Sequence, residues 1–228
     1  MKENDLPGGE APTAIVIVDD GARNSAIASA LGTAGWTVRE ARPIPADIAA
    51  CLEQPVALIL LGLRINDDAP NIVRIIRTSP GANAMAPILG LIDGAADQHD
   101  PKSSEFDGML RMADEDTALA YAASRWWPVS LAPTRRISAM LGAGPIAGMI
   151  ERLALRLEAA LSALARDPVS ARGSIDRAEA HRLAGLCGTL GFAQAHAAWL
   201  DLSLGDESAL GEVRRTTRLT LAAIARGL

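Results

Sequence analysis

Short apolar runs rich in β-branched residues recur through the first 125 residues and then stop, and this pattern constrains the fold more than any other feature. Amphipathic stretches separate the runs, which is typical of βαβ units around a parallel sheet. We expect strands at residues 14–18, 36–40, 56–61, 86–92 and 106–112, and a closing helix at 114–125. Residues 13–125 are therefore predicted to form one α/β domain with a doubly wound sheet.

Five βα units of this kind predict a flavodoxin-like fold. Residues 126–136 hold two tryptophans, two prolines and two arginines, and the periodicity is lost there, so we expect a linker. The first residues, 1–12, are polar and rich in Glu, Asp, Gly and Pro, which predicts a flexible tail.

Beyond residue 136 only helical periodicity remains. Apolar residues recur at helical spacing from Ile146 to Leu164, and Pro168 ends this stretch. A second helix is predicted from an N-cap at Ser174 to about Leu190, and two more are predicted at 192–204 and 210–228. Four helices joined by short loops predict an all-α four-helix bundle over residues 137–228.

Composition excludes several classes of function. The net charge of −5 would repel a phosphate backbone, so we expect no nucleic acid partner. No apolar run is long enough to cross a bilayer and no signal peptide is evident, so we expect a cytoplasmic protein without a membrane partner. Cys51 and Cys187 form no metal-binding or disulfide pattern, and we expect no metal site.

One histidine stands out on the second helix of the predicted bundle. On an ideal helix the side opposite His181 is apolar, whereas Arg177, Ala184, Gly185 and Gly188 fall within about 60° of it. Glycine costs about 1 kcal/mol relative to alanine inside a helix, so two glycines beside the imidazole suggest that a bulky partner approaches it. A neutral imidazole offers a ring nitrogen that can attack an acyl phosphate.

The segment from Ala180 to Gly191, AHRLAGLCGTLG, resembles the phosphoacceptor motif AHxLKGxxxxLG of histidine phosphotransfer (HPt) domains. The resemblance implies that His181 is the phosphoacceptor and that Ala184, Gly185 and Gly188 belong to a docking face. The family usually has lysine where this chain has Ala184. Arg177, one turn earlier, could supply the missing charge to the phosphoryl group.

The first predicted strand and the acidic pair after it, Asp19 and Asp20, resemble the start of response-regulator receiver domains, whose carboxylates hold Mg²⁺. The third strand leads to Gly62 where that family has its phosphoacceptor aspartate. Ile92 replaces the family's Ser or Thr, and Met112-Ala113 replaces Lys-Pro. We therefore expect a pseudo-receiver without phosphorylation chemistry, in which Asp19 and Asp20 are vestigial or bind Mg²⁺ weakly.

These resemblances imply a phosphocarrier of a bacterial two-component phosphorelay that is not itself an enzyme and needs no cofactor. His181 would exchange a phosphoryl group with receiver domains, which supply the Mg²⁺, and a hybrid histidine kinase would be the upstream partner. The pseudo-receiver would serve docking, regulation or a homodimer. The alternatives are a non-phosphorylated scaffold that binds receivers or kinases and a histidine-kinase fragment, although no ATP-binding glycine boxes follow His181.

Overall fold

The computed structural model describes residues 11–62, 69–93, 106–112, 116–166 and 176–227. The chain divides into two compact units, Met1–Pro128 and Val129–Leu228, and the division falls inside the predicted linker 126–136. Most of the predicted tail, residues 1–12, lies outside the described residues.

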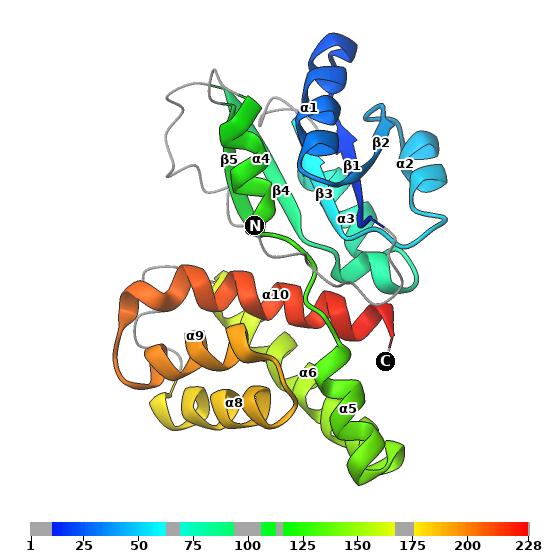
Figure 1. Ribbon diagram of the computed structural model, residues 1–228. Coiled ribbons are helices and arrows are strands. Elements are labelled where there is room, and N and C mark those ends of the chain that lie inside the picture. The colour runs from blue at the N-terminus through cyan, green and yellow to red at the C-terminus, as the bar shows by residue number, and fades with distance from the viewer. Residues whose placement is uncertain (1–10, 63–68, 94–105, 113–115, 167–175, 228) are drawn as a thin grey trace. The chain divides into compact units, whose positions relative to one another are not determined.

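The N-terminal unit contains a five-stranded parallel sheet (Figure 1). Its strands are β1 (Thr13–Ile17), β2 (Thr37–Ala41), β3 (Leu58–Leu61), β4 (Ile88–Asp93) and β5 (Gly108–Met112). The strand order is β2-β1-β3-β4-β5, and each neighbouring pair runs parallel. This order confirms the predicted flavodoxin-like fold of the N-terminal unit.

Helices connect these strands and bury the apolar side chains of the sheet. They are α1 (Gly21–Thr33), α2 (Pro45–Cys51), α3 (Ala69–Arg77), the short 3-10 helix η1 (Ala82–Met85) and α4 (Asp116–Ser124). Ile15, Ile17 and Ile59 alternate along their strands and share one core cluster with residues of α2 and α3. Strands β1, β3 and β4 are buried on both faces, which explains why they are continuous apolar runs in the sequence.

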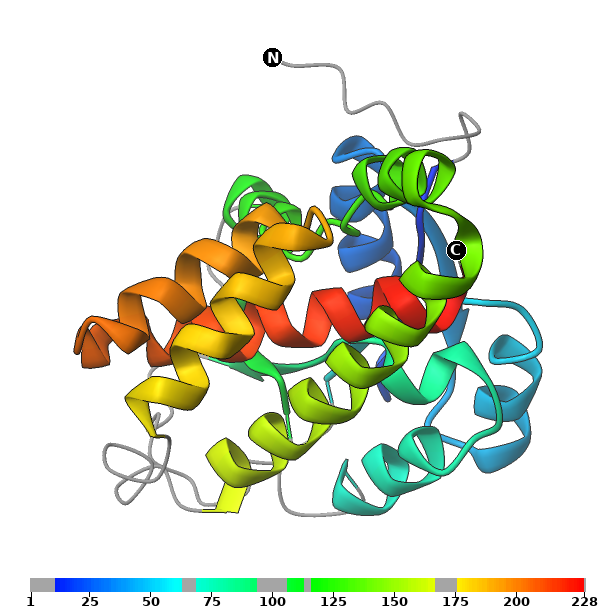
Figure 2. The same ribbon diagram turned by 90° about the horizontal axis from the view of Figure 1, so that it is seen from below.

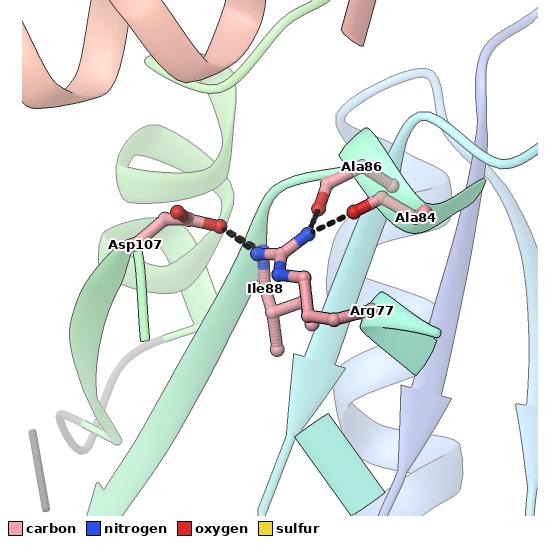
Figure 3. Close-up of polar contacts among 5 residues, drawn as sticks. All are labelled: Arg77, Ala84, Ala86, Ile88 and Asp107. Carbon is pink, nitrogen blue, oxygen red and sulfur yellow. Dashed lines mark hydrogen bonds and ion pairs between the residues drawn. The ribbon is translucent and has the colours of Figure 1, made fainter. Parts of the chain in front are cut away.

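An ion pair fixes the amino ends of β4 and β5. The guanidinium of Arg77 lies 2.5 Å from a carboxylate oxygen of Asp107 and donates to the carbonyl oxygens of Ala84 and Ala86 (Figure 3). The same carboxylate accepts a hydrogen bond from the backbone nitrogen of Ile88 at 2.8 Å. Because Ile88 begins β4 and Asp107 precedes β5, this arrangement holds the two strand starts together.

Two tryptophans of the predicted linker belong to the N-terminal unit. Trp126 is buried and its ring lies against Gly108, while Trp127 packs on Gly35 and meets Trp36 edge to face with ring centres 5.0 Å apart. The start of the segment predicted as a linker is therefore packed in the core of this unit.

The described residues of the C-terminal unit are mostly helical. The helices are α5 (Ala132–Leu141), α6 (Ala143–Arg166), α8 (Arg177–Thr189), α9 (Ala193–Ser203), the short 3-10 helix η3 (Glu207–Ala209) and α10 (Leu210–Arg226). Helix α5 was not predicted, because it begins inside the expected linker. Helices α8 and α9 run side by side (Figure 2). None of the helices in the described part of the chain is long and apolar enough to cross a membrane.

The turn between α8 and α9 is tied to the start of α5. The hydroxyl of Thr134, which is fully buried, donates to the carbonyl of Leu190 at 2.7 Å. Gly191 follows with φ of 85°, a left-handed conformation that glycine adopts without strain. Pro133 packs directly over that glycine, so a side chain at position 191 would also collide with the start of α5.

Candidate functional site

Helix α8 carries the predicted phosphoacceptor. It begins after Asp176, whose carboxylate accepts a hydrogen bond from the backbone nitrogen of Ala178 at 3.1 Å. Asp176 is therefore the N-cap, whereas the predicted cap, Ser174, lies outside the described residues. The side of the helix opposite His181 is buried in the core of the C-terminal unit through Leu183, Cys187 and Leu190.

His181 itself is exposed. Its imidazole makes no hydrogen bond or ion pair with any described residue, and nothing lies within 4 Å of the position that a β-carbon on Gly185 would occupy. The neighbouring Arg182 donates to the carbonyl of Ala178 and lies 3.4 Å from a carboxylate oxygen of Glu179. The imidazole thus stands on an open surface, while the nearest cation in sequence is paired with other groups.

Arg177 is also exposed, but its guanidinium extends away from its own helix. A β-carbon placed on Gly205 would lie 2.9 Å from a terminal guanidinium nitrogen of Arg177, so this group lies directly over the turn after α9. Arg177 forms no ion pair with a described residue. The structure therefore leaves its charge unpaired within the described part of the chain, but not in contact with His181.

The prediction that Ala184 belongs to an exposed docking face is wrong. Its side chain is only 1% exposed and lies in the core cluster of the C-terminal unit. Helix α9 covers this side of α8, and the Nδ1 atom of His196 lies 2.9 Å from the carbonyl oxygen of Ala184. Gly185 and Gly188 are exposed, as predicted.

Gly188 has a local packing role as well. A β-carbon on this residue would lie 3.0 Å from Nδ1 of His196, which is tighter than an ordinary contact. The absence of a side chain lets the imidazole of His196 lie against α8. The sequence alone does not connect His196 with Gly188, because that contact depends on how two helices pack.

Cys187, which is fully buried in α8, is not a candidate nucleophile. Burial raises the pKa of its thiol to about 12, so the thiol stays protonated at neutral pH. The exposed imidazole of His181 is then the nitrogen nucleophile among the residues of α8.

The residues that the sequence analysis compared with receiver domains lie at the carboxyl edge of the sheet. Asp19 and Asp20 are exposed and follow β1, and the backbone nitrogen of Gly62, after β3, donates to the carbonyl of Ile17. A β-carbon on Gly62 would overlap Cγ1 of Val18 and lie 3.3 Å from Cδ1 of Leu91. Apolar side chains from the two neighbouring strands therefore occupy the space that a phosphoacceptor side chain needs.

The other receiver positions lack polar groups or are not described. Ile92 is buried on β4, and nothing is described for the side chain of Met112 or for Ala113. Mg²⁺ prefers several oxygen ligands, but no group of three His, Cys, Asp or Glu side chains occurs among the described residues. Weak Mg²⁺ binding by Asp19 and Asp20 therefore stays a prediction.

Comparison with known proteins adds little beyond the strand order. No protein-family model matches the chain, and no curated protein matches it significantly. Among solved structures, the chemotaxis response regulator CheY4 of Vibrio cholerae matches with 15% identity and a TM-score of 0.43, covering 51% of this chain and 98% of that one. Full-length FixJ from B. japonicum matches with 14% identity and a TM-score of 0.40, covering 91% of this chain and 97% of that one.

The classification of the N-terminal unit therefore rests on its own geometry. Five parallel strands in the order β2-β1-β3-β4-β5 define the fold class, and the packing around Gly62 distinguishes this unit from a domain with a working phosphoacceptor at that position. The chain combines a flavodoxin-like N-terminal unit with a C-terminal unit that is mostly helical in its described residues.

Proposed function

We propose that this chain is a histidine phosphotransfer protein of a two-component phosphorelay, with His181 as the phosphoacceptor. The observation that carries the proposal is an exposed imidazole, without a hydrogen bond or ion pair to the described residues, in the segment AHRLAGLCGTLG on a helix whose other side is core. An unpaired imidazole is available to attack, and the open surface at Gly185 admits a partner.

The proposed reaction is a reversible transfer. A ring nitrogen of His181 attacks the phosphorus of an aspartyl phosphate on a receiver domain, the bond between phosphorus and the aspartate oxygen breaks, and a free carboxylate leaves. The reverse step regenerates the aspartyl phosphate on the same or another receiver. Phosphoryl transfer depends mainly on positioning and charge stabilisation, so the receiver supplies the metal and this chain supplies the nucleophile.

The N-terminal unit has a different role in this proposal. The packing of Val18 and Leu91 around Gly62 leaves no room for phosphorylation at that site, so this unit would dock or regulate partners. Partners are intact receiver domains and an upstream hybrid histidine kinase, and the protein would act in the cytoplasm.

The direct test is transfer of labelled phosphate from a panel of phosphorylated receiver domains. We expect acid-labile, base-stable label on the wild-type chain and on the matched control His99→Ala, and none on His181→Ala. If the wild type takes no label from any receiver yet still binds one, phosphotransfer is the wrong function.

Arg177 can be tested in the same assay. Its charge is the unpaired cation of α8 within the described part of the chain, and it lies one turn before His181 on the same face. If its guanidinium moves to the phosphoryl group, Arg177→Ala should slow transfer about tenfold, the usual scale for one charge-assisted hydrogen bond. Transfer at the wild-type rate would remove Arg177 from the mechanism.

A second candidate function is a non-phosphorylated scaffold that binds receiver domains or kinases. Two observations favour it: Ala184 is buried where HPt domains usually have lysine, and the guanidinium of Arg177 lies over Gly205. A scaffold predicts partner binding that persists in His181→Ala with no phosphorylation of the wild type.

A further inference from the structure

His196 joins α9 to the helix that carries His181. Its Nδ1 atom lies 2.9 Å from the carbonyl oxygen of Ala184, and the ring lies against Gly188. A carbonyl oxygen can only accept, so Nδ1 carries the hydrogen and donates it. In the neutral ring, Nε2 is then left with a lone pair that can accept a hydrogen bond.

The position of this ring relative to the phosphoacceptor follows from helix geometry. Gly188 is seven residues after His181, which places it about 20° from His181 around the axis and about 10 Å along it. Gly188 is exposed, and its missing side chain is what admits the imidazole of His196. His196 therefore flanks the same face of α8, two turns beyond His181.

His196 is half-buried, and its second ring nitrogen, Nε2, is not fully enclosed. Among the described residues Nε2 has no hydrogen-bonding partner, and it is not one of the enclosed polar atoms without a partner, which are Asn24 Oδ1, Trp36 Nε1 and Trp127 Nε1. The bond to Ala184 fixes the ring, so Nε2 is held in place before any partner arrives. A pre-ordered group loses little conformational entropy on binding.

We propose that His196 is a specificity-determining contact for the receiver domain that exchanges phosphate with His181, and that its Nε2 accepts a hydrogen bond from a donor group on that receiver. This inference rests on the proposed function for the identity of the partner. A typical protein interface covers about 800 Å² per partner, or a patch roughly 30 Å across. A contact about 10 Å along α8 from the phosphoacceptor lies inside such a patch.

The test distinguishes the role of Nδ1, which bonds to Ala184, from the role of Nε2, which would bond to the receiver. In His196→Asn the side-chain amide can take the place of Nδ1–H and keep the bond to Ala184, but the outward acceptor is lost. We expect the Kd for the cognate receiver to rise about tenfold, with an unchanged unfolding midpoint and an unchanged transfer rate at saturating receiver. His196→Gln, whose longer amide reaches toward the position of Nε2, should recover part of the affinity.

A wild-type Kd in His196→Asn would overturn the inference. So would a loss of affinity that accompanies a lower unfolding midpoint and is not recovered in His196→Gln, because that result indicates a purely structural role.

Separate measurements of binding and of phosphate transfer distinguish a failure of the His196 contact from a failure of the proposed function. Affinity is also measured in the His181→Ala background with unphosphorylated receivers, which needs no phosphorylation. Binding that depends on His196 without any label on the wild type would keep the contact and reject the proposed function. Label on His181 with normal binding by His196→Asn would keep the function and reject the contact, and the absence of binding to any receiver would also reject the contact.

Discussion

At the scale of one residue, Gly62 stands where the sequence resemblance predicts the phosphoacceptor aspartate of a receiver domain. The sequence reveals the missing aspartate, but the structure adds that Val18 and Leu91 occupy the space around it. An aspartate at position 62 would therefore meet apolar side chains.

Gly62→Asp should destabilise the N-terminal unit by about 3 kcal/mol, because overpacking and an unpaired buried charge both oppose folding. Chemical denaturation measures the loss, and Gly21→Asp is the matched control, since nothing lies within 4 Å of a β-carbon there. The Gly62→Asp chain should also take no phosphate from small-molecule donors. A Gly62→Asp chain that is as stable as the wild type and becomes labelled at residue 62 would contradict this account of the site.

Cys187 makes a pH-dependent contribution to stability. Burial raises its thiol pKa from 9.0 to about 12, so the folded thiol is neutral in a range where the unfolded thiol ionises. The unfolded state then binds fewer protons than the folded state, and stability falls as pH rises from about 9 toward 12. Below pH 9 this contribution is fully present.

Urea unfolding at pH 8 and pH 10.5 measures this effect. The wild type should lose up to about 2 kcal/mol more than Cys187→Ala over this range, at about 1.4 kcal/mol per pH unit. Equal pH dependence in the two proteins would show that the thiol of Cys187 ionises as readily in the folded state as in the unfolded state.

The residues around His181 show which parts of a site a sequence can predict. The apolar side predicted opposite His181 is in the core, through Leu183 and Cys187, and Gly185 is at the surface as predicted. The helical wheel misplaced Ala184, because the angle around a single helix does not reveal which side the next helix covers. The contact of His196 with Gly188 was hidden for the same reason.

At the scale of the element, the strands were the easiest features to predict. A buried parallel strand is a continuous apolar run, and β1, for example, spans Thr13–Ile17 where residues 14–18 were expected. Helix α5, Ala132–Leu141, was missed because Trp, Pro and Arg side chains interrupt the periodicity before it and in its first turns. Its start is stabilised by contacts with the distant turn between α8 and α9, which local sequence does not encode.

The hydrogen bond from Thr134 to Leu190 is the clearest of these contacts. Thr134→Val keeps the side-chain shape but removes the buried hydroxyl, so we expect a loss of about 1–2 kcal/mol in the free energy of unfolding. Thr189→Val is the control, because the Thr189 hydroxyl bonds to a carbonyl of its own helix at an exposed position and should contribute less than about 0.5 kcal/mol. Equal effects in the two variants, measured by denaturant unfolding, would argue that this bond does not anchor α5.

At the scale of the whole molecule, the chain joins a flavodoxin-like unit, which has a buried glycine at position 62, to a helical unit with one exposed histidine on α8. The proposed division of labour follows from this contrast. In this proposal the N-terminal unit docks or regulates partners, and the helical unit presents His181 on a surface open to a partner.

The central claim is that His181 carries the phosphoryl group, and the most direct measurement is to locate that group on the intact chain. The full-length protein is mixed with a phosphorylated receiver, digested at alkaline pH and sequenced by mass spectrometry. The chain has three histidines, His99, His181 and His196, so the peptides separate the candidates. We predict one phosphoryl group, on His181; phosphate on any other residue, or none on a chain that demonstrably binds the receiver, would contradict the claim.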